Sequence, residues 1–71
     1  MERAYVNAAW NALPENRRNV LLHRDRVGLI RWIKRLLRER MPGLGDTQAT
    51  ITAARIATEM FGAQPPEKGS R

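Results

Sequence analysis

The chain has 71 residues, which is enough for one small domain, and its 42% apolar residues are sufficient to form a core. It has no cysteine and one histidine, which excludes disulfide bonds and leaves too few ligands for a structural zinc site. Thirteen Lys and Arg residues against seven Asp and Glu give a net charge of +6, so we expect a polyanionic partner.

The first predicted helix covers residues 3–13. Apolar side chains recur there at helical spacing, which is typical of an amphipathic helix with one buried side. This stripe consists of Tyr5, Val6, Ala9, Trp10 and Leu13. Pro14 cannot continue the helix, because it lacks an N–H group and its ring clashes with the preceding turn.

The longest helical pattern covers residues 15–41, and we expect one long, basic, amphipathic central helix there. Its apolar face is formed by Leu22, Leu29, Ile30, Ile33, Leu36 and Leu37. Helical spacing continues without interruption through Val20, Leu22, Val27 and Ile30. The alternative is a short helix at 15–23 and a second one after Arg24, since Asp25 suits an N-cap and Gly28 disfavours helix.

A third helix is predicted over residues 46–61. The preceding segment, residues 42–45 (PGLG), ends the central helix because proline and glycine favour a turn. Asp46 or Thr47 would cap the third helix at its start, and Gly62 would cap its end. Its row of mostly small residues predicts close contact with another helix and consists of Ala49, Ala53, Ile56 and Met60.

The segment after Gly62 has a different composition. Residues 63–71, AQPPEKGSR, contain two prolines and no apolar residue beyond alanine. They predict a disordered C-terminal tail, which leaves residues 1–62 as the single helical domain.

Together these elements predict an all-α fold, a small three-helix domain, and we expect it to form a homodimer. A continuous central helix would be about 40 Å long, more than the two shorter helices can cover. Arg26 and Arg40 fall inside its apolar sector, where a buried arginine needs a partner. That partner is water at the rim, Glu59, or a carboxylate of a second chain, so Arg26 and Arg40 are candidate dimer contacts.

The other face of the central helix is basic and is the candidate surface for a partner. The candidate residues for binding nucleic acid or protein are Arg17, Arg24, Arg31, Trp32, Lys34, Arg35 and Arg38. Against a phosphate backbone such cations supply salt-sensitive affinity, and Gly28 would form a notch in their row. The alternative is a solvated helix face, with Trp32 in the core instead of stacked on a base.

The sequence has no pattern that indicates catalysis. His23 is alone, and the carboxylates show no paired arrangement, so we expect no enzyme, metal, cofactor or small-molecule substrate. No apolar run approaches the roughly 18 residues of a membrane span, and the N-terminal residues lack a signal-peptide pattern, which predicts a soluble cytoplasmic protein.

Two functions remain after these exclusions. The first is nucleic-acid binding through the arginine-rich helix face, mainly by phosphate contacts. The second is a protein-binding regulator or inhibitor that docks its helical surface on an acidic patch of a larger host protein, as accessory proteins of phages and mobile elements do.

Overall fold

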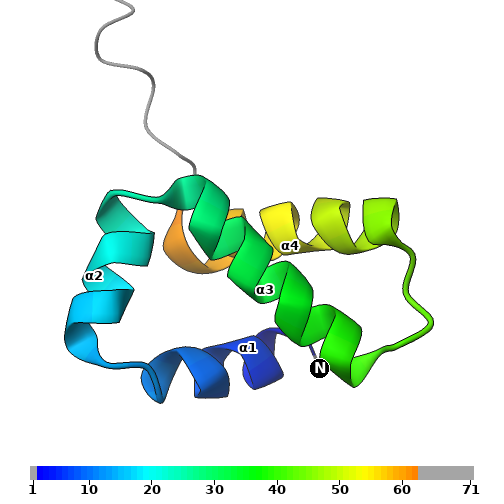
Figure 1. Ribbon diagram of the computed structural model, residues 1–71, viewed down its shortest axis with the longest axis horizontal. Helices are drawn as coiled ribbons and strands as arrows, with labels where there is room; N and C mark the ends of the chain where they lie inside the picture. The colour runs from blue at the N-terminus through cyan, green and yellow to red at the C-terminus, as the bar shows by residue number, and fades with distance from the viewer. Residues whose placement is uncertain (1, 63–71) are drawn as a thin grey trace, which may run out of the picture.

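A computed structural model describes residues 2–62, and this part of the chain consists of four α-helices without a β-strand (Figure 1). The helices are α1 (Glu2–Asn11), α2 (Glu15–His23), α3 (Arg26–Arg40) and α4 (Asp46–Phe61). α3 contacts each of the other three helices, and Figure 1 shows it crossing in front of α1 and α4. The prediction of an all-α fold is therefore confirmed, whereas the tail predicted at 63–71 lies outside the described residues.

The predicted continuous helix over residues 15–41 is wrong, and the alternative with a break after Arg24 is confirmed. α2 ends where the Arg24 N–H donates to the carbonyl of Val20 at 2.8 Å. α3 then starts behind Asp25, whose side chain accepts a hydrogen bond from the backbone N–H of Gly28 at 2.8 Å. The fold thus has four helices instead of three, because a capping carboxylate prevails over unbroken apolar spacing.

Gly28 serves this cap and forms no notch in a continuous row of arginines. A Cβ atom added at Gly28 would lie 2.2 Å from an Asp25 carboxylate oxygen, closer than atoms can approach. The absence of a side chain at Gly28 therefore makes room for the capping carboxylate of Asp25. This carboxylate fills the space predicted as a notch.

The other helix ends follow the predicted chemistry with small shifts. α1 ends two residues before the predicted position, and a tight turn follows in which Leu13 N–H donates to the Trp10 carbonyl. α4 covers the predicted range, and Gly62, with a φ of 84°, forms its C-cap. The N-cap of α4 is Gly45, so Asp46 does not cap the helix and its side chain is available for another contact.

The core lies where α1, α2 and α4 pack against the apolar side of α3. Its buried members are Val6, Trp10, Leu21, Leu29, Ile33, Leu37, Ala53, Ile56 and Ala57. The small residues of α4 bring it close to α3, as predicted, and Ala57 is buried in addition to the predicted row. Trp10 lies at the centre of an aromatic cluster, with ring centroids 5.7 Å from Trp32 and 4.6 Å from Phe61.

Arg26 and Arg40 both find partners within the same chain. Arg26 donates a hydrogen bond to the Gly62 carbonyl at the end of α4. The Arg40 guanidinium lies 4.9 Å from the centroid of the Tyr5 ring, a cation–π distance. Glu59, one of the three alternatives for their partner, lies 3.4 Å from Arg3.

Both reasons for predicting a homodimer are therefore removed. The central helix is divided into two shorter helices, and the two arginines that suggested a second chain are satisfied without one.

None of the four helices within residues 2–62 combines the length and the apolar character that crossing a bilayer requires.

Candidate anion-binding groove

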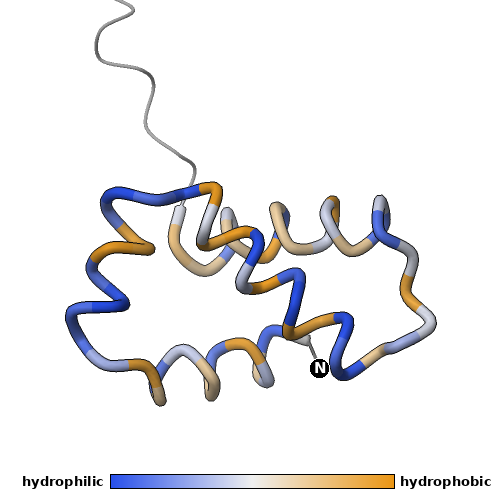
Figure 2. The backbone as a smooth tube through the Cα atoms, viewed as in Figure 1, coloured by the Kyte–Doolittle hydropathy of each residue, from blue (hydrophilic) through white to orange (hydrophobic). Residues whose placement is uncertain are grey.

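The outer side of α3 is basic because most of the apolar residues of this helix lie on its inner side. Leu29, Ile33 and Leu37 are completely buried, and the residues half a turn away, Arg31 and Arg35, are exposed. Figure 2 shows this division as hydrophilic positions that alternate with hydrophobic ones along α3. The same amphipathic pattern that forms the core thus directs a set of cations away from it.

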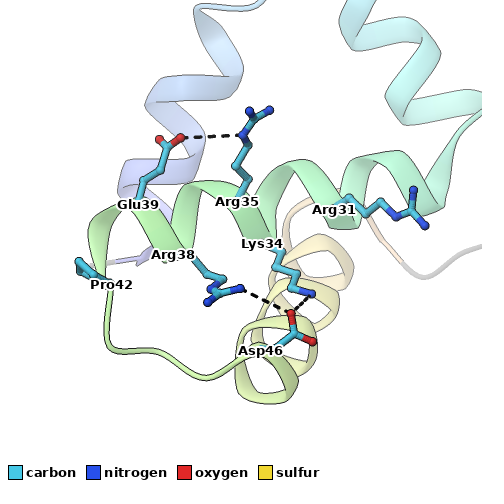
Figure 3. Close-up of a pocket in the computed structure, with 7 residues that line it drawn as sticks. All are labelled: Arg31, Lys34, Arg35, Arg38, Glu39, Pro42 and Asp46. Carbon is cyan, nitrogen blue, oxygen red and sulfur yellow. Dashed lines mark ion pairs between the residues drawn. The ribbon is translucent and has the colours of Figure 1, made fainter.

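A shallow groove of about 550 Å³ runs along this side of α3 and the loop that follows it (Figure 3). Its lining residues are Arg31, Lys34, Arg35, Arg38 and Glu39 of α3, Pro42 of the loop, and Asp46 at the start of α4. Four cations and two carboxylates face this surface, so it carries an excess of positive charge that suits an anionic ligand.

Two of the cations converge on a single carboxylate oxygen. Lys34 Nζ lies 2.6 Å and Arg38 Nη1 lies 3.6 Å from Oδ1 of Asp46. The Lys34 side chain is only 25% exposed, whereas that of Asp46 is 70% exposed. Lys34 is therefore mostly covered, whereas the carboxylate that it meets is mostly open to solvent. Figure 3 shows the Lys34 and Asp46 side chains pointing toward each other.

The charge state of Asp46 reflects this contact. The pKa of Asp46 lies below its ordinary value of 3.8, first because Lys34 donates a hydrogen bond to it and adds its positive charge, and further because of Arg38. Asp46 is thus a carboxylate at neutral pH and occupies the position in which Lys34 and Arg38 would hold an oxygen of a bound anion.

The remaining two cations of the groove are directed toward solvent. Arg35 Nε lies 4.0 Å from the Glu39 carboxylate one turn later, but both side chains are more than half exposed, so this pair contributes little. Arg31 forms no ion pair with any residue in the described range 2–62. Arg31 and Arg35 are therefore the groove cations most available to a ligand.

Not all of the predicted binding residues come together here. The groove contains Arg31, Lys34, Arg35 and Arg38, but Arg17 and Arg24 belong to α2 and its C-terminal end and do not line it. The break at Asp25 interrupts the predicted arginine row. Trp32 is half-buried and packs against Trp10, which corresponds to the core alternative for this residue.

Three lining residues were not among the predicted ones: Glu39, Pro42 and Asp46. Glu39 was visible in the sequence as an acidic neighbour of Arg35 at the spacing of one helical turn. Asp46 is twelve residues from Lys34 and meets it only because α4 packs back on α3, which no helical periodicity within one segment reveals.

The charges of the lining side chains determine what the groove can hold. Its side chains are cations, carboxylates and a proline. Within residues 2–62, no cluster of three or more His, Asp or Glu residues is arranged to hold a metal ion. What this arrangement can do is attract and hold anions.

No known protein family, curated protein or solved structure matches this chain. A functional interpretation therefore depends on the geometry and charge of the groove.

Proposed function

We propose that this protein binds nucleic acid through the cationic side of α3, mainly by contacts to phosphates. The observation that carries the proposal is that four cations, Arg31, Lys34, Arg35 and Arg38, line one open groove. Lys and Arg side chains in such a row neutralise phosphates and release condensed counterions, which supplies affinity without base recognition.

An extended polyanion fits this surface better than a small anion does. The groove is shallow and open, and its cations from Arg31 to Arg38 extend over about 10 Å of helix axis at 1.5 Å per residue. A single phosphate could contact only one end of this row, whereas a nucleic-acid backbone contacts several cations at once. The net charge of +6 adds long-range attraction for the same class of partner.

Asp46 fits the proposal as an internal substitute for a phosphate. Its carboxylate oxygen is held by Lys34 and Arg38 but remains open to solvent, so a phosphate oxygen can displace it. Arg31 and Arg35 offer the first contacts, and Lys34 and Arg38 are added when Asp46 moves aside.

The proposal is tested by binding of a fluorescent oligonucleotide at low salt, measured by anisotropy. The double variant Arg31→Gln/Arg35→Gln removes two groove cations and should bind at least about tenfold more weakly. The matched control Arg3→Gln/Arg55→Gln removes the same charge from exposed positions outside the groove and should bind nearly as the wild type does. The absence of binding by the wild type, or equal losses in the two variants, would overturn the proposal.

A protein-binding regulator or inhibitor is the second candidate, and exposed apolar side chains favour it. Val20 and Val27, on either side of the α2–α3 junction, are 42% and 61% exposed, and Ile51 on α4 is 56% exposed. A protein complex formed there would survive nuclease and about 0.5 M salt, whereas phosphate-dominated binding weakens steeply with salt.

A further inference from the structure

All four aromatic rings of the chain are used inside the fold. The sequence has two Trp, one Tyr and one Phe, and none of them lines the groove. Trp10 is buried between Trp32 and Phe61, and Tyr5 is half-buried beneath Arg40. The cationic surface therefore offers no ring on which an unpaired base could stack.

The lack of an aromatic ring in the groove indicates which form of nucleic acid the surface would prefer. Proteins that bind single strands combine a cationic channel with aromatic side chains that stack on successive bases. Here only the cations are present, so affinity depends on the density of phosphate charge. A duplex presents one charge per about 1.7 Å of axis, twice the density of either strand alone.

The shape of the surface is that of an exposed helix. The Cα atoms span 41 × 27 × 16 Å, and the shortest dimension leaves room for about two helix layers at a usual interhelical distance of roughly 8–10 Å. Within residues 2–62 the outer side of α3 has Arg31, Arg35 and Arg38 exposed, with α4 contributing only Asp46 to the groove (Figure 3).

An exposed helix of this kind fits one form of duplex. The major groove of B-form DNA is about 12 Å wide and admits an α-helix, whereas that of A-form RNA is deep and narrow. The cations of α3 would then reach phosphates along the edge of the major groove.

We infer that the partner is double-stranded DNA in the B form, contacted by α3 along its major-groove edge, in preference to single strands or to duplex RNA. This inference rests on the proposed nucleic-acid binding and names the form of the ligand. The charge complementarity between the groove cations and a duplex backbone supports it, together with the position of every aromatic ring outside the groove.

The test compares three probes of about 20 base pairs or nucleotides, roughly two helical turns, at one low ionic strength. The probes are a DNA duplex, a homopolymeric thymidine strand and an RNA duplex. We expect the DNA duplex to bind about tenfold more tightly than the single strand, and more tightly than the RNA duplex. The variant Arg31→Gln/Arg35→Gln should reduce this preference, because the duplex, with its denser phosphates, then loses more contacts than the single strand does.

A second variant separates stacking from phosphate contact. Trp32→Leu removes the aromatic ring but keeps an apolar side chain against the core, and we expect it to leave the relative affinities for the three probes unchanged. Equal or tighter binding of the single strand would overturn the duplex preference, and equal binding of duplex RNA would overturn placement in the B-form groove; in both cases phosphate binding would still stand. If none of the three probes bound, the proposed function itself would fail.

Discussion

Asp46 is the residue that most affects how the cations of the groove are paired. It is the only carboxylate among the described residues that meets two groove cations at one oxygen. Under the proposed function it would therefore compete at neutral pH with an incoming phosphate for Lys34 and Arg38. The same contact links α4 to α3, so we expect Asp46 to contribute to stability and, under the proposed function, to limit the affinity for phosphate.

Replacing Asp46 with Asn should strengthen binding of nucleic acid. The change releases Lys34 and Arg38 and removes one negative charge, and we expect about a fivefold gain in affinity at low salt. Glu59→Gln is the matched control, since it also removes one negative charge but lies outside the groove, beside Arg3. Anisotropy titrations of both variants check this, and a gain no larger than that of the control would contradict the role of Asp46.

The pH dependence of stability follows from the lowered pKa of Asp46. A folded pKa below the unfolded value of 3.8 means that the stabilisation is present at higher pH and is lost as pH falls through the folded pKa. Asp46→Asn should therefore lower the urea midpoint slightly near neutral pH and leave it close to that of the wild type in strong acid. If the difference in urea midpoint between the variant and the wild type grew as the pH fell, the stabilising role of the ionised Asp46 would be contradicted.

Asp25 and Gly28 act as a coupled pair at the start of α3. Asp25→Ala removes the cap and should cost about 1 kcal/mol. Gly28→Ala alone should change stability little, because the gain in helix propensity, about 1 kcal/mol, is offset by displacement of the Asp25 carboxylate. In the Asp25→Ala background the same substitution should stabilise by about 1 kcal/mol. Urea unfolding of the four proteins measures this coupling, and additive effects would contradict it.

At the scale of helices, the sequence was sufficient where strong end signals were present and insufficient where they were weak. α4 was predicted with its full range because proline and glycines precede it and Gly62 follows it. The break between α2 and α3 carries no proline or turn glycine, and apolar residues keep helical spacing across it. The deciding signal was the capping preference of Asp25, which competed with that spacing and prevailed.

The candidate site was predictable to a similar degree. Arg31, Lys34, Arg35 and Arg38 follow from helical periodicity within one segment, and all four line the groove. Arg17 and Arg24 would join this row only if residues 15–41 formed one continuous helix, and the break between α2 and α3 separates them from it. The contact of Lys34 with Asp46 depends on how two helices pack across a loop, and tertiary contacts of this kind are not encoded in a local pattern.

At the scale of the whole molecule, the core and the groove are formed by different kinds of side chain. Aromatic and aliphatic residues are used to join four short helices, and even Arg26 and Arg40 serve the fold through Gly62 and Tyr5. The cations of the groove are not needed for the core. A small chain with a net charge of +6 thus has one helix that organises the core on one side and presents positive charge on the other.

The central claim, that groove cations bind phosphates, is tested most directly by the salt dependence of DNA affinity. For the wild type the logarithm of the binding constant should fall linearly with the logarithm of salt concentration. For Arg31→Gln/Arg35→Gln the slope should be smaller by about two, one for each lost phosphate contact. The control Arg3→Gln/Arg55→Gln should keep the wild-type slope. An unchanged slope in the groove variant would contradict phosphate binding by α3.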